Sequence, residues 1–131
     1  MTQNSRGVFQ ITNWDETPYS ENDDGSKQSH ARIRQSYDGD IEGTSEVQYL
    51  MSYQTPASAV FVGHETITGS VFGKSGSFVI QHNGTFENGI AKSTFQIVPN
   101  SGRGDLAGIE GDGEFVSTGD GQVSYTLVIN A

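Results

Sequence analysis

Hydrophobic and polar residues alternate with a period of two along almost the whole chain. Near the C-terminus, for example, Val123, Tyr125, Leu127 and Ile129 occupy every second position. A β-strand points successive side chains to opposite faces, so this alternation is typical of strands that bury one face. No stretch shows the 3.6-residue apolar spacing of an amphipathic helix. The pattern therefore predicts a nearly all-β protein.

The alternating stretches are separated by short sequences typical of turns, such as Asp38-Gly39-Asp40 and Glu87-Asn88-Gly89. The eight strands that we expect cover residues 7–14, 27–37, 41–53, 59–72, 77–86, 90–98, 111–116 and 123–129. Residues 15–25 are polar and turn-like, and 99–111 is the least strand-like segment, with at most one short helical turn near 105–108. An open meander of eight strands would leave two long edges, which closure into a barrel removes. We therefore predict a closed antiparallel barrel, with a two-sheet sandwich as the alternative.

The alternation also assigns residues to faces. In the first predicted strand it places Phe9 and Ile11 on one face and Trp14 on the other. The run Ala59-Val60-Phe61-Val62 is apolar at both parities, as expected of a strand covered on both sides. A barrel in water buries only its inner face, so apolar residues on the outside favour a partner. We expect a homo-oligomer, most simply a homodimer.

Composition narrows the function classes. A chain of 131 residues fits one domain spanning 1–131, and its net charge of −9 disfavours nucleic acids and anionic membranes. No apolar run approaches the roughly 20 residues of a membrane helix, and the N-terminus lacks a signal peptide, which predicts a cytoplasmic location. The chain has no cysteine for disulfides or thiol catalysis, its acidic turns lack the ligand series of a calcium loop, and its three histidines have no paired spacing. We expect neither a metal nor a cofactor.

Two ionisable residues stand on faces that are otherwise apolar. Glu65 shares a parity with Phe61 and Ile67, and His82 shares one with Phe78 and Ile80. Such a group must find a partner or shift its pKa, and ligand sites are rich in such groups. We therefore predict that Glu65, His82 or both lie at the wall of an internal cavity; a structural ion pair or an exposed rim position is the alternative. The other candidate ligand-binding residues are Glu46, Phe61, Phe78 and Tyr49.

Five stretches occur in an order that resembles a known family. They are Trp14-Asp15-Glu16-Thr17-Pro18, residues 46–53 (EVQYLMSY), residues 61–65 (FVGHE), residues 76–86 (GSFVIQHNGTF) and residues 102–111 (GRGDLAGIEG). Together they resemble a bacterial family annotated only as a domain of unknown function, which is similar to the allene oxide cyclase barrels. The last stretch is also similar to the glycine-rich signature of plant dirigent proteins. The resemblance implies a calycin-like, eight-stranded barrel that forms oligomers and holds an apolar ligand while it cyclises or couples. No catalytic residue carries over by position.

Three functions from different classes remain open. The first is a binding module whose interior holds a small, largely apolar molecule. The second is an isomerase or cyclase, in which Glu65 or Glu46 stabilises positive charge and His82 moves a proton. The third is a structural or interaction protein whose barrel is filled by its own side chains.

Overall fold

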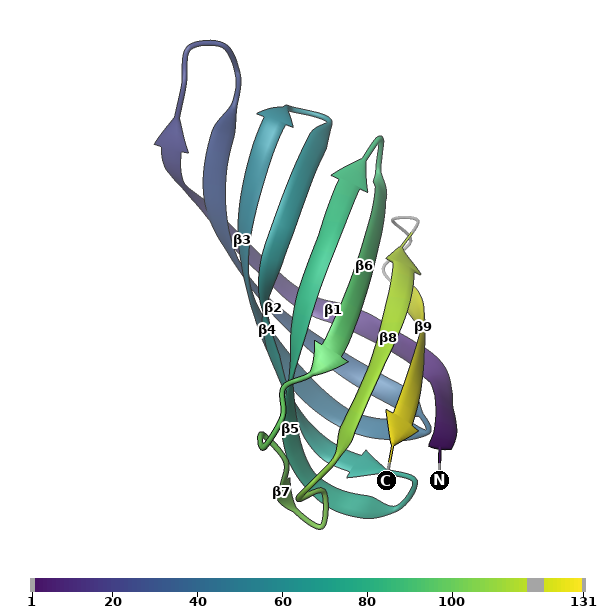
Figure 1. Ribbon diagram of the computed structural model, residues 1–131. Helices are drawn as coiled ribbons and strands as arrows, with labels where there is room; N and C mark the ends of the chain where they lie inside the picture. The colour runs from purple at the N-terminus through teal and green to yellow at the C-terminus, as the bar shows by residue number, and fades with distance from the viewer. Residues whose placement is uncertain (1, 118–121, 131) are drawn as a thin grey trace.

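The computed structural model describes residues 2–117 and 122–130, which contain nine strands (Figure 1). The strands are β1 (Thr2–Glu21), β2 (Lys27–Gly39), β3 (Ile41–Thr55), β4 (Ser58–Val71), β5 (Lys74–Glu87), β6 (Ile90–Ile97), β7 (Arg103–Gly104), β8 (Glu110–Ser117) and β9 (Gln122–Asn130). The described part of the chain contains no helix, and hence none long and apolar enough to cross a membrane.

Eight of these strands close into a barrel. They pair side by side in the order β4-β3-β2-β1-β9-β8-β6-β5, and a further pairing between β4 and β5 completes the ring. All pairs are antiparallel, and the two-residue strand β7 lies outside the ring against β5. The predicted closed antiparallel barrel is confirmed, and the sandwich alternative is wrong. The expected turn at 105–108 is also present, between β7 and β8.

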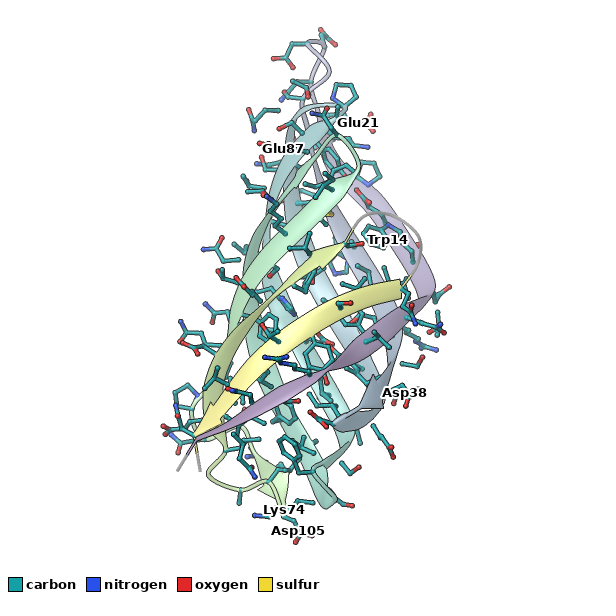
Figure 2. All side chains as sticks on the ribbon, turned by 90° about the vertical axis from the view of Figure 1, so that its right-hand side faces the viewer. Trp14, Glu21, Asp38, Lys74, Glu87 and Asp105 are labelled. Atoms are coloured by element: carbon teal, nitrogen blue, oxygen red, sulfur yellow. The ribbon has the colours of Figure 1, made fainter. Side chains whose placement is uncertain are left out.

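The two ends of the barrel differ. Figure 2 shows Glu21 and Glu87 at one end and Lys74 and Asp105 at the other. Leu106 and Ile109, from the loop between β7 and β8, are buried and belong to the core. We name the end near Lys74 and Asp105 the plugged end, and the end near Glu21 and Glu87 the open end.

Strand β1 is longer than predicted, and Trp14 lies on a different face of it than predicted. Its pairing with β2 skips Thr12, so that Ile11 lies opposite Gln35 and Trp14 lies opposite Ile33. This β-bulge moves Trp14 onto the same face as Phe9 and Ile11, so the prediction that Trp14 lies on the opposite face is wrong. The strand also runs through residues 15–21, predicted as a turn, because β2 continues to pair with them as far as Lys27.

The outer face of β4 also corrects an expectation. Phe61 is buried inside the barrel, but Val60 and Val62 remain 55% and 50% exposed on the outside. The apolar run at 59–62 is therefore covered on one side only within this chain.

Candidate functional site

Glu65 on β4 and His82 on β5 meet inside the barrel. Each lies on the inward parity of its strand, and their side chains are 1% and 2% exposed. His82 Nε2 lies 2.7 Å from Glu65 Oε1. The structure therefore brings together the two residues that the sequence singled out, in the ion-pair arrangement of the alternative interpretation.

Two further residues complete this network. The Tyr37 hydroxyl on β2 donates to Glu65 Oε2, and His82 Nδ1 lies 2.9 Å from the Ser93 hydroxyl on β6. The Ser93 hydroxyl also lies within hydrogen-bond distance of the Thr94 carbonyl, to which it can donate, at 3.2 Å. A carboxylate only accepts, so His82 Nε2 is the donor in its contact with Glu65. Both carboxylate oxygens of Glu65 and both ring nitrogens of His82 are thus engaged.

Aromatic rings enclose this polar network. The ring centroids of Phe95, Tyr49 and Phe115 lie 5.1, 5.4 and 5.7 Å from that of His82. Burial and the nearby Glu65 carboxylate raise the pKa of both Tyr37 and Tyr49 well above its usual value. Both hydroxyls are therefore protonated at neutral pH and act as hydrogen-bond donors.

A cavity of about 200 Å³ occupies the interior towards the open end. Trp14 and Gly89 lie at its rim, and Trp14 is 48% exposed, so the cavity communicates with solvent there. Figure 2 shows Trp14 on the half of the barrel nearer Glu21 and Glu87. The described lining residues are mostly apolar, and none of them is Asp, Glu, Lys, Arg or His: Phe9, Ile11, Trp14, Ile33, Gln35, Tyr49, Met51, Phe61, Phe86, Gly89, Ala91, Phe115, Ser117 and Val123.

The candidate ligand-binding residues lie at the cavity wall, elsewhere in the buried interior, or on the outer face of the barrel. Tyr49 and Phe61 line the cavity, whereas Phe78 is buried in the core away from it. Glu65 and His82 do not line it; Tyr49 and Phe115 border the cavity and also pack on the His82 ring. Glu46 lies on the outer face of β3 in an ion pair with Arg32. The expected cavity therefore exists, but its wall is made by the neighbours of the ion pair.

Two inward-facing glycines let aromatic rings lie close to the barrel wall. A Cβ atom at Gly84 would stand 2.4 Å from Phe61 Cζ, and one at Gly63 would stand 2.8 Å from Tyr49 Cδ1. Each ring thus covers the backbone of the neighbouring strand, in a space that any larger residue would fill. This close packing against the wall leaves the centre of the open end free.

A second polar cluster fixes the rim. Glu16 accepts hydrogen bonds from Trp14 Nε1 at 3.1 Å and from the Ser29 hydroxyl at 2.5 Å. Burial, together with the Glu16 carboxylate, raises the pKa of Tyr53 to about 12. Glu16 therefore holds the Trp14 side chain in place at the mouth of the cavity.

Sequence reasoning missed Tyr37, Gln35 and Ser93, although a weak signal was present for each. Gln35 and Tyr37 continue the inward parity of Ala31 and Ile33, and Ser93 lies between Ala91 and Phe95 on the inward parity of β6. A polar residue at an inward position marks a buried hydrogen bond or a cavity wall. Trp14 could not be assigned, because the bulge at Thr12 has no sequence signature.

Comparison with known proteins gives the family. A family model described as a protein of unknown function, DUF3224, matches residues 5–128. A crystal structure from Shewanella oneidensis, described as a protein with unknown function from the DUF3224 family, is similar over 99% of this chain and 98% of that one, with 26% identity and a TM-score of 0.79. No curated protein matches the chain. The predicted resemblance to a domain-of-unknown-function family is confirmed: the chain belongs to the DUF3224 family.

Proposed function

We propose that this protein binds a small, largely apolar molecule inside its barrel. The observation that carries the proposal is the cavity at the open end, with aromatic walls and a rim at Trp14 and Gly89. Small-molecule sites are typically concave and mostly apolar, with a few polar groups that fix orientation. This cavity has that character, with Gln35, Tyr49 and Ser117 as its polar members besides the rim tryptophan.

The volume limits the size of the ligand. An apolar cavity of about 150 Å³ holds a benzene molecule, and sites for drug-sized ligands begin near 300 Å³. A cavity of about 200 Å³ lies between the two. It therefore suits one ring with a short substituent, or a short branched chain.

Two observations favour ligand binding over a structural role and over catalysis as an isomerase or cyclase. A barrel filled by its own side chains would not leave this space among the apolar residues of its interior. Catalysis by Glu65 and His82 would require them to reach the ligand, but neither lines the cavity, and their polar atoms are engaged with Tyr37, Ser93 and each other. We therefore propose retention of a ligand without turnover.

Ethylbenzene is a suitable probe, because it matches the cavity in size and polarity. Trp14 is the single tryptophan of the chain and lies at the rim, so its fluorescence should change saturably as ethylbenzene binds. Replacing Ala91→Phe puts a ring into the cavity and should abolish the change. The matched control Ala57→Phe lies in the exposed turn after β3 and should leave it intact.

Circular dichroism of both variants checks that the barrel is retained. No saturable signal in the wild type, or unchanged binding in Ala91→Phe, would contradict the proposed function.

A further inference from the structure

We infer that the ligand is a neutral molecule carrying a hydrogen-bond acceptor oxygen, such as a ketone or an aldehyde, and that Tyr49 and Gln35 recognise it. This inference rests on the proposed function and specifies the ligand class. It comes from the polar groups that border the cavity, since these decide which polar atom of a ligand is accommodated.

Tyr49 presents the first donor. Tyr49 is 5% exposed and lines the cavity. Its ring packs against Phe61 and His82. Its hydroxyl has no hydrogen-bond partner among residues 2–117 and 122–130, unlike that of Tyr37, which is bound to Glu65. A donor that lines the cavity without a partner in the described part of the chain is left for a bound molecule, and a ligand oxygen in the cavity would satisfy it.

Gln35 presents the second donor. Its residue is 4% exposed, and it lines the same cavity from β2. Its Oε1 accepts from the Ser45 hydroxyl at 3.4 Å, whereas its Nε2 has no acceptor within the described part of the chain. Two buried residues thus each offer an unused N–H or O–H to the cavity, and neither requires a donor from the ligand.

The surroundings exclude a charged ligand. None of the lining residues within 2–117 and 122–130 is acidic or basic, so a carboxylate or ammonium bound against them would lose its hydration without gaining a counter-ion. The raised pKa of Tyr49 keeps this residue a neutral donor. A carbonyl oxygen accepts strongly while remaining neutral, so ketones and aldehydes fit best.

Acetophenone and ethylbenzene provide a matched pair of probes, since they differ by the carbonyl oxygen and are close in shape. Calorimetric titration gives the ratio of their Kd values for the wild type and for Tyr49→Phe. Comparing this Kd ratio in the wild type with the same ratio in the variant cancels the difference in hydration between the two probes. Loss of one hydrogen bond should lower the preference for acetophenone about fivefold and leave ethylbenzene binding unchanged. Tyr19→Phe, at an exposed tyrosine outside the cavity, should keep the wild-type ratio.

Gln35→Leu serves as a second variant in case Tyr49→Phe does not fold. It should also lower the preference for acetophenone over ethylbenzene. An unchanged ratio in the folded variants, with ethylbenzene still bound, overturns the inference on ligand class and leaves the proposed function standing. Failure of the wild type to bind either probe overturns both.

Discussion

Two carboxylates on neighbouring strands lie in opposite environments. Glu65 is buried and accepts hydrogen bonds from His82 and Tyr37, whereas Glu46 pairs with Arg32 on the outer face, where their side chains are 40% and 51% exposed. Removing one partner of a buried pair leaves the other without its partner away from water, which lowers stability strongly. An exposed pair is screened by solvent, so removing one partner changes stability little. The two residues therefore form a natural comparison.

Replacing Glu65→Gln should lower the free energy of unfolding by about 3 kcal/mol, because the buried donors of Tyr37 and His82 lose the carboxylate that accepts from both, while the shape is preserved. The matched change Glu46→Gln should cost less than about 1 kcal/mol. Urea denaturation of both variants measures the difference. Equal effects would contradict the buried ion pair. Ethylbenzene affinity should be retained in Glu65→Gln, since Glu65 does not line the cavity.

The buried tyrosines predict how stability depends on alkaline pH. The pKa of Tyr53 is raised from its ordinary value near 10 to about 12, and those of Tyr37 and Tyr49 also lie well above their ordinary value. Between these values the unfolded chain loses protons that the folded chain keeps, so stability is complete below pH 10 and falls as the pH rises above it. Unfolding by urea at several pH values from 9 upward tests this, and Tyr53→Phe should make the decline shallower. A stability that stays constant from pH 9 to 12 would show that these hydroxyls ionise freely.

At the scale of the elements, period-two alternation was sufficient to predict the barrel, because each strand buries one face and water covers the other. Strand β3 illustrates this: Val47, Tyr49, Met51 and Tyr53 are all buried, as alternation indicates. Alternation fails where pairing is irregular. The bulge at Thr12 reverses the face of the residues that follow it as far as Pro18, where a second register shift occurs, and it arises from the register with β2 rather than from a local preference.

Alternation also predicted part of the candidate site, namely its ionisable residues but not their contact with each other. Glu65 and His82 were identified because an ionisable residue on an apolar face is unusual, but their contact depends on the relative register of β4 and β5, which alternation leaves undefined. The cavity was beyond sequence reasoning for a different reason. It depends on how much of the interior the side chains fill, and therefore on close packing such as that of Phe61 over Gly84.

For the whole molecule, the outer surface supports the prediction of a homodimer. Leu50 on β3 lies opposite Val62 on β4, and Val60 lies further along β4; all three are at least half exposed. Light scattering at micromolar concentration should therefore give twice the monomer mass of 14.1 kDa. Val62→Lys should shift the protein to the monomer mass, because a charge in this patch resists burial. A wild-type protein that scatters as a monomer would contradict the prediction.

The barrel as a whole encloses an apolar cavity towards the end near Glu21 and Glu87, and we propose that a small molecule occupies this space. Mass spectrometry of the small molecules released from gently purified protein tests this most directly, with Ala91→Phe purified in parallel. We predict a neutral compound of about one ring in size, near one molecule per chain, in the wild type and absent from Ala91→Phe. Equal amounts of the same compounds from both proteins, or none from either, would contradict the claim.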